Sequence, residues 1–401
     1  MPRFISKILI AVSLTAAIGL ISIPNTHAQP ATLSDEATIT MFTILPGTAP
    51  EELFGHSAFR VIDPQQNLDI MFNYGTFQFD EFFLPRFIYG ELNYFLSVAR
   101  TAFAIEHYRE RRRPIIEQVL NLTPNQQQSL YGFLINNARE ENRYYLYDFL
   151  FDNCSTRIRD AMEAVFGDDV RFKPEPDPQL TFREMIALYV DGNSFIHFGI
   201  DLLLGRRIDR EVTPYEAMFL PDFLELAFDH AVITIDGEEQ PLVVSKETIM
   251  TVDDYDTETA GMPWMHIILW ALFLGAVWVT WKNHQSGTIL NRWFDIPLFA
   301  MVGIIGLLIT FLWFISLHHV TADNINLFWA WPFHLFVVPF LFKKLNPESL
   351  LRYYFALHAA ACLVILLGWF FWAQEIHSAI LPLLLTVLLR SGWAGYSMIW
   401  R

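Results

Sequence analysis

The spacing of apolar residues divides the chain into two parts. From Met262 onward they form long blocks, whereas residues 29–255 mix apolar and polar positions at shorter intervals. Five blocks in the second part are each long enough to cross about 30 Å of hydrocarbon as a helix. They cover residues 262–281, 296–317, 325–342, 353–373 and 378–398. The pattern predicts a transmembrane domain over 256–401, built as an all-α bundle of about five helices.

In the first part, apolar residues recur at the shorter spacings of strands and amphipathic helices, which predicts an α+β domain over 29–255. Residues 58–62 and 70–74 alternate between apolar and polar positions and flank a turn, which is typical of a β-hairpin. Residues 124–137 follow the capping residue Thr123 and predict a helix. A second helix is expected from Ser155 onward, because apolar residues recur there at helical spacing.

The first 28 residues resemble an export signal. Arg3 and Lys7 precede an apolar run over 8–23, and Ala28 supplies a small residue before a cleavage point. A membrane helix needs about 20 apolar residues, so this run is short for a span. We expect a cleaved signal peptide over 1–28, with an uncleaved first membrane helix as the alternative.

Lysine and arginine occur in alternate loops between the apolar blocks, while the loops at 318–324 and 374–377 contain neither. The basic residues are Lys282, Arg292, Lys343, Lys344 and Arg352. The positive-inside rule places the basic loops in the cytoplasm and the α+β domain outside. Arg390 interrupts the fifth block and is expected to pair or to reach the membrane surface.

The predicted outer domain is strongly acidic. Between Gln29 and Ala260 there are 39 acidic and 18 basic residues, a net charge of −21. Nucleic-acid binding requires a basic face, so the charge argues against a nucleic-acid partner.

The chain has two cysteines, Cys154 and Cys362. Exported cysteines usually pair, but Cys362 lies inside an apolar block. Cys154 is therefore expected to be a free thiol, either reactive or buried and inert. It stands in the run 152–157, at the start of a predicted helix. The helix dipole favours a thiolate there, and unpaired backbone N–H groups can stabilise an oxyanion.

A nucleophilic cysteine needs a base. The histidines of the predicted outer domain are His56, His107, His197 and His230. His107 lies in an arginine-rich stretch typical of a solvated surface. His56 follows Gly55, which permits close approach of the backbone, where a loop enters a predicted strand.

Three short runs together resemble the Lnb family of bacterial lipoprotein N-acylation transferases. They are Phe-Gly-His-Ser-Ala at 54–58, Asn-Tyr-Gly-Thr-Phe at 73–77 and Asp-Asn-Cys-Ser-Thr-Arg at 152–157. The runs at 199–205 and 218–222 also look like that family, so the similarity spans about 50–225. The order of motifs is similar to a permuted papain-like cysteine fold, as in lecithin:retinol acyltransferases.

The resemblance implies roles for individual residues. Cys154 matches the nucleophile and His56 the base. The residue that orients the histidine matches Asn73 or Tyr74, and Asn73 is chosen because of the direction in which its strand position faces. Residues expected near the substrate or the oxyanion are Asn153, Ser155, Tyr74 and Arg157. If the family requires a histidine as orienting residue, this chain departs from the pattern.

The resemblance also implies a function. The expected protein is a multi-pass enzyme of the bacterial inner membrane with its catalytic domain in the periplasm. It would move a fatty acyl chain from a lipid ester, through a Cys154 thioester, to the α-amine of the N-terminal lipidated cysteine of lipoproteins. Expected partners are diacylglyceryl-modified lipoproteins and membrane lipid, and no cofactor or metal is expected. The donor is either the lipoprotein itself or a phospholipid.

Two other classes of function stay open. One is a cysteine peptidase or amidase acting on the cell wall, in which water replaces the amine. The other is a non-enzymatic membrane scaffold or transporter. An aromatic stretch between Phe82 and Phe95 is expected either to enter the membrane interface or to form ordinary core.

Overall fold

The computed structural model describes residues 31–173, 179–255, 261–343 and 349–399. The predicted signal peptide over 1–28 lies outside the described residues. The chain packs as two units, which we call the mixed unit (1–87, 91–179 and 212–257) and the helical unit (88–90, 180–211 and 258–401).

The mixed unit is built on an antiparallel sheet of seven strands in the order β10-β5-β1-β2-β3-β4-β6. The strands are β1 (Thr38–Ile44), β2 (His56–Asp63), β3 (Leu68–Thr76), β4 (Asn93–Arg100), β5 (Ile115–Leu120), β6 (Tyr144–Leu146) and β10 (Val243–Met250). The predicted hairpin is confirmed as β2–β3, with Phe59 opposite Phe72. Asp63 caps its turn by accepting from the N–H groups of Gln65 and Gln66.

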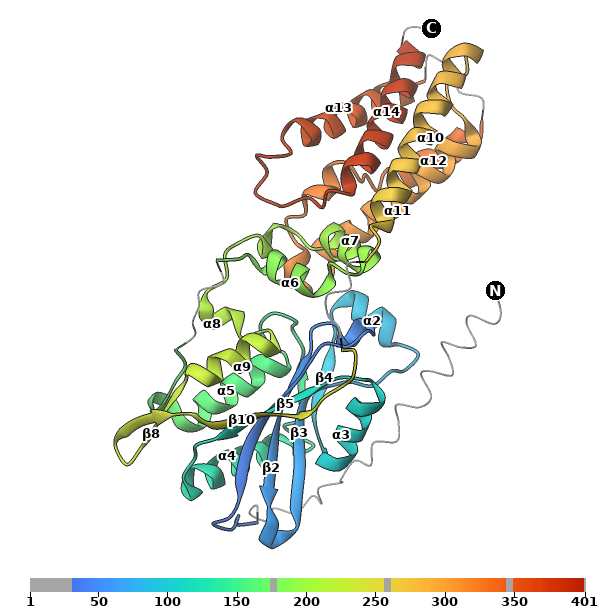
Figure 1. The fold of residues 1–401 in the computed structure, drawn as a ribbon. Helices are drawn as coiled ribbons and strands as arrows, with labels where there is room; N and C mark the ends of the chain where they lie inside the picture. The colour runs from blue at the N-terminus through green and yellow to red at the C-terminus, as the bar shows by residue number, and fades with distance from the viewer. Residues whose placement is uncertain (1–30, 174–178, 256–260, 344–348, 400–401) are drawn as a thin grey trace. The chain divides into compact units, whose positions relative to one another are not determined.

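Helices cover both faces of this sheet, with α3 on one face and α4 and α5 on the other (Figure 1). The helices and short strands outside the sheet are α2 (Phe83–Tyr89), α3 (Thr101–Glu110), α4 (Pro124–Asn137), α5 (Cys154–Phe166), α8 (Pro214–Ala217), α9 (Pro221–His230), β7 (Val170–Arg171), β8 (Val232–Ile235) and β9 (Glu238–Pro241). The predicted helix at 124–137 is confirmed as α4, which begins at a capping box formed by Thr123 and Gln126.

The alternation of side chains along each strand sends neighbouring residues into different cores. Phe59 and Phe72 pack with α4 and α5, whereas Ala58 and Met71 pack with α3. His56 and Asn73 occupy the same strand parity as Ala58 and Met71. The sheet thus assigns both polar residues to the α3 face.

Among the described residues of the helical unit, three helices are long and apolar enough to cross a membrane: α10 (Trp264–Ser286), α11 (Arg292–Phe314) and α14 (Ile380–Ile399). The predicted fourth span is the shorter apolar helix α13 (Leu351–Leu367). Two short helices, α6 (Phe182–Val190) and α7 (Ser194–Leu203), also belong to this unit. Phe198 and Leu202 of α7 lie in its core, although they fall within the predicted 29–255 domain.

The prediction of one helix over 325–342 is wrong. The segment forms a short 3₁₀ helix at Ile325–Phe328 and then α12 (His334–Leu341). Pro332 lies between the two, where it removes a backbone donor. The buried side chain of Asn326 donates to the carbonyl of Leu202 at 3.2 Å, which holds the chain in a non-helical path.

The arginine inside the fifth predicted span pairs within the bundle. Arg390 of α14 donates from Nε and Nη2 to the two carboxylate oxygens of Asp295 of α11, at 2.7 and 2.8 Å. Both side chains are fully buried. Arg390 Nη1 also donates to Thr280 of α10 at 2.6 Å, so one guanidinium joins three helices.

Candidate functional site

Cys154 is the first residue of α5, and Asn153 fixes that helix start. The Asn153 Oδ1 accepts from the N–H groups of Ser155 and Thr156 at 2.8 and 2.9 Å. Its Nδ2 donates to the carbonyls of Phe149 and Phe219. Asn153 is buried and fully engaged in these bonds. It therefore positions Cys154. The cap bonds the N–H groups of Ser155 and Thr156 and does not use the N–H of Cys154.

His56, the first residue of β2, connects Cys154 to Asn73 of β3. A hydrogen bond and the charge of His56 both act on the Cys154 thiol. On its other side, His56 Nε2 contacts Asn73 Oδ1. Because an amide oxygen only accepts, Nε2 carries the ring proton and Nδ1 is left to accept the proton of the thiol. The structure thus brings Cys154, His56 and Asn73 together in that order.

The surroundings of Cys154 favour its thiolate. Burial raises the pKa of the Cys154 thiol, but the charge and hydrogen bond of His56, the Ser57 N–H and the Ser155 hydroxyl lower it, to a net value of about 7. The Ser155 hydroxyl lies 3.9 Å from Sγ and 3.1 Å from the hydroxyl of Ser57. A thiol with this pKa is substantially ionised at neutral pH.

The other two residues expected near the site have internal roles. Tyr74 is buried in the core with its ring 6.4 Å from that of Tyr145, on the sheet face opposite to Asn73. Arg157 pairs with Asp152 and lies 4.0 Å above the ring of Tyr145. Its guanidinium is therefore engaged on both its edge and its face.

Two buried residues behind Asn73 were not predicted from the sequence. A hydrogen bond joins the Tyr108 hydroxyl of α3 to the Asn73 side chain. Burial raises the pKa of Tyr108 to about 12, so its hydroxyl stays protonated at neutral pH. The Arg113 guanidinium lies 5.4 Å from the Tyr108 ring and its positive charge acts on Cys154. Tyr108 thus fixes Asn73, and Arg113 adds to the positive potential at the thiol.

Gly75 brings the backbone of β3 close to the thiol. Its φ of +83° belongs to the left-handed region, and a Cβ at this position would lie 3.5 Å from the Cβ of Cys154. The same position would lie 3.9 Å from atoms of Tyr145 and Tyr147. These distances are ordinary van der Waals contacts, so the glycine is required here by its backbone conformation.

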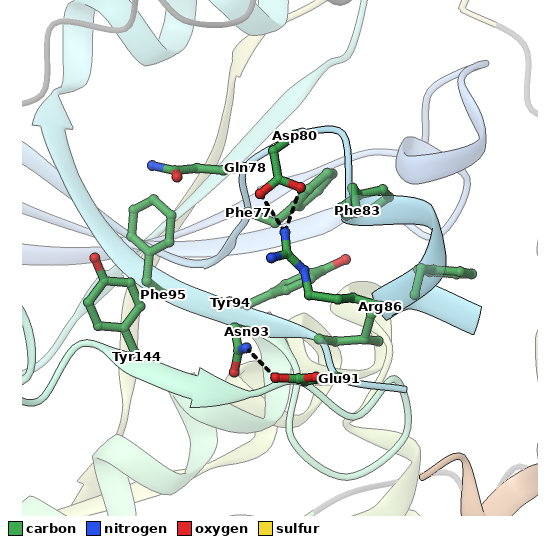
Figure 2. A pocket seen from close by; sticks show the side chains of 12 residues that line it. Phe77, Gln78, Asp80, Phe83, Arg86, Glu91, Asn93, Tyr94, Phe95 and Tyr144 are labelled. Atoms are coloured by element: carbon green, nitrogen blue, oxygen red, sulfur yellow. Dashed lines mark hydrogen bonds and ion pairs between the residues drawn. The ribbon is translucent and has the colours of Figure 1, made fainter. Parts of the chain in front are cut away.

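Aromatic rings lead from the thiol to a cavity of about 190 Å³. Tyr147 stacks on Tyr94 with ring centroids 4.4 Å apart, and Tyr94 stacks on Phe77 at 4.9 Å. Figure 2 shows Phe77, Phe83 and Tyr94 around the cavity, with charged groups at its rim. One of these is the ion pair between Arg86 and Asp80, at 2.6 Å. The cavity thus combines an aromatic lining with a polar rim, which suits an amphipathic ligand.

The aromatic stretch is divided between the core and the protein surface. Tyr94 and Phe95 are buried, whereas Phe82 and Phe87 are exposed. The exposed rings therefore leave an apolar surface beside the lining of the cavity.

The fold and the site define a membrane protein whose α+β domain carries a Cys–His–Asn cluster at a helix N-terminus. Two family models match the chain: the Lnb N-terminal periplasmic domain over residues 26–187 and the Lnb transmembrane domain over residues 257–399. The chain belongs to the Lnb family. It is therefore a bacterial membrane protein with a periplasmic domain and a function related to lipoprotein N-acylation. No curated protein and no solved structure matches it.

Proposed function

We propose that this protein is a thiol-dependent acyltransferase of the bacterial inner membrane, which crosses that membrane several times. It moves a fatty acyl chain from a lipid ester to the α-amine of the N-terminal lipidated cysteine of lipoproteins. The observation that carries the proposal is the place of His56 between Cys154, whose thiol pKa it helps to lower to about 7, and Asn73, whose Oδ1 it contacts. The permuted papain-like arrangement and the thioester step are parts of the proposal.

In the first half-reaction His56 Nδ1 accepts the thiol proton and Sγ attacks the ester carbonyl carbon. The tetrahedral oxyanion then collapses, the bond to the alcohol oxygen breaks, and protonated His56 returns the proton to that oxygen. The products are an acyl thioester on Cys154 and a lyso-lipid alcohol. The Cys154 N–H is the amide best placed along the chain to stabilise the oxyanion, because the cap uses the next two.

In the second half-reaction the α-amine of the substrate cysteine attacks the thioester carbonyl. His56 accepts the amine proton, and collapse of the intermediate releases the Cys154 thiolate and an amide. The sum is ester plus amine giving amide plus alcohol, so no oxidant, reductant or cofactor is needed. Asn73 keeps the imidazole in one orientation through both halves, since Nε2 stays bonded to Oδ1.

The aromatic cavity supports a lipid substrate over a cell-wall peptide. Stacked rings run from Tyr147, which like Cys154 lies beside Gly75, through Tyr94 to Phe77. An acyl chain laid along these rings would gain about 25 cal/mol for each Å² of apolar surface removed from water. A peptidase using the same thiol has no need for such a lining.

The test is mass spectrometry of lipoprotein N-terminal peptides from cells that lack their usual N-acylating enzyme. Cells with the wild-type protein are expected to give N-acylated peptides, and cells with Cys154→Ala only free-amine peptides at equal protein level. Cys362→Ala serves as the cysteine control and should behave as wild type. N-acylation that survives Cys154→Ala would overturn the thiol mechanism. Free-amine peptides in every strain would overturn lipoprotein as the substrate and favour the cell-wall alternative.

A further inference from the structure

A cluster of histidines and carboxylates lies within the helical unit, separate from the thiol site in sequence. His197 and Asp201 of α7 and His377, which precedes α14, each offer a ligand atom, and these atoms lie within 4.8 Å of one another. His197 and Asp201 fall between the two matched family ranges, 26–187 and 257–399. They stand four positions apart on α7, so they share one helix face.

The geometry of His197 is that of a metal-binding histidine with an orienting carboxylate. Its Nε2 lies 3.2 Å from Asp201 Oδ2, and its Nδ1 lies 3.0 Å from Asp191 Oδ1. Histidine ligands commonly donate their second ring N–H to a carboxylate, which fixes the tautomer and the ring orientation. Asp191 takes that place here, and Nε2 is directed at Asp201.

Asp201 is held in position by a buried arginine. Arg183 Nη1 donates to Asp201 Oδ1 at 2.8 Å, while Arg183 Nε donates to Asp209 at 2.7 Å. The arginine thus engages one carboxylate oxygen of Asp201 and leaves Oδ2 facing His197. The two buried carboxylates, Asp201 and Asp209, thus share the one guanidinium of Arg183.

Two further histidines complete the surroundings. The His377 ring stands perpendicular to that of His197 with centroids 4.7 Å apart, and the His266 ring lies 5.5 Å from His377. Among the described residues, the buried His266 Nδ1 has no hydrogen-bond partner. The Ala379 N–H donates to His377 Nδ1 at 3.1 Å, and a metal ion bound at that nitrogen would replace this hydrogen bond. An imidazole nitrogen without a partner is a ligand available to an ion.

We propose that His197, Asp201 and His377 bind a divalent transition-metal ion, with His266 or water in the fourth position. Two imidazoles and one carboxylate form a ligand set that suits zinc. The ligands come from α7 and from the segment before α14, and His266 lies near the start of α10. The ion would fasten residues 180–211 to the ends of two apolar helices and stabilise the helical unit.

The test uses the full-length protein in detergent, with Cys154 and Cys362 both replaced by serine so that no thiolate can bind metal. After chelator treatment, zinc is titrated back while bound metal and the thermal unfolding temperature are measured. One zinc per chain and a higher unfolding temperature are expected. Asp201→Asn should abolish stoichiometric binding, and Asp191→Asn should weaken it by about 10- to 100-fold, as for other orienting carboxylates. His318→Ala, at a histidine outside the cluster, is the matched control and should bind as the parent does.

Cobalt binding to the parent protein provides a second measurement. It does not require the variants at the ligand residues to fold. The parent protein with cobalt in place of zinc should show the visible spectrum of a site with nitrogen and oxygen ligands. Substoichiometric zinc, together with an unfolding temperature unchanged by chelator, would overturn the proposal. It would leave His197 as a cation paired with Asp191 and Asp201. Neither outcome depends on acyl transfer by Cys154.

Discussion

Asn73 Oδ1 accepts a hydrogen bond from His56 Nε2, while the hydroxyl of Tyr108 hydrogen-bonds the same Asn73 side chain. One amide thereby fixes the tautomer of the proposed base and is itself fixed from α3. With Nε2 engaged by Asn73, Nδ1 is the ring nitrogen left to serve the thiol.

Replacing Asn73 tests that relationship. Asn73→Ala should lower kcat for lipopeptide N-acylation by about 100-fold, at the low end of what a positioned base contributes, with little change in KM. The rates are measured with a synthetic diacylglyceryl lipopeptide in mixed micelles. Tyr108→Phe keeps the ring and loses only the outer hydrogen bond, so a loss of about tenfold or less is expected. Equal losses in both variants would contradict a direct role for Asn73.

The ionisation of Cys154 predicts a pH profile. Because the thiolate reacts and the pKa of the thiol is about 7, alkylation by iodoacetamide should rise through pH 7 and level off above pH 8. His56→Gln removes the charge that lowers this pKa, so its profile should move to higher pH. The experiment uses a Cys362→Ala background and quantifies carbamidomethylated Cys154 by mass spectrometry. A wild-type profile that rises only near pH 9 would contradict the assigned environment.

The same shift links pH to stability. A folded-state pKa below the unfolded value gives stability that is fully present above the unfolded pKa, near 9, and lost as the pH falls through about 7. Cys154→Ser should remove this part of the pH dependence of the unfolding temperature between pH 9 and 7. If the plots of unfolding temperature against pH stay parallel for wild type and variant over that range, Cys154 makes no such contribution to stability.

Gly75 is expected to be required by its backbone conformation. Gly75→Ala forces an L-residue to a φ of +83° and puts a methyl group against Cys154 and two tyrosines. Strain of about 1–3 kcal/mol is expected from the backbone alone. Thermal unfolding measures the loss, and the alkylation rate of Cys154 reports the displaced thiol. Gly237→Ala, at another positive φ but with open space around it, should show strain without a change in thiol reactivity.

The ion pair between Arg390 and Asp295 predicts strong coupling in the bundle. Arg390→Leu leaves Asp295 buried without its partner, so a loss of about 3–5 kcal/mol is expected. The double variant Arg390→Leu with Asp295→Leu should recover part of that loss. A double-mutant cycle measured by chemical unfolding in detergent gives the coupling, and additive losses would contradict it.

Local sequence signals were sufficient for several elements. The β2–β3 hairpin follows from alternation around a turn, and α4 from its capping residue Thr123. The start of α5 at Cys154 follows from Asn153, a residue type that caps helices. His56 was selected through the resemblance to a family and Asn73, over Tyr74, through the direction of its strand position, and the fold supplies their contact.

Other features depend on contacts that no local pattern encodes. Tyr108 reaches the site from α3, and Arg113 reaches it from the turn after α3. In the sequence, Tyr108 looks like an ordinary helix residue and Arg113 like an ordinary surface charge. The break within 325–342 depends on Asn326 meeting the carbonyl of Leu202, a residue far away in sequence. His377 joins His197 and Asp201 only through the packing of the helical unit, so the sequence led us to expect no metal.

The absence of a disulfide between the two cysteines has a consequence for how the protein is inactivated by oxidation. Both are free, Cys362 is buried in α13, and Cys154 is a half-buried thiol that is readily ionised. Such a thiolate is the form that oxidants convert to sulfenic acid. With no accessible second cysteine to resolve it, repair would require a reductant supplied from outside the chain. If the proposed acyl transfer is correct, its rate would then follow the supply of reducing equivalents in the periplasm.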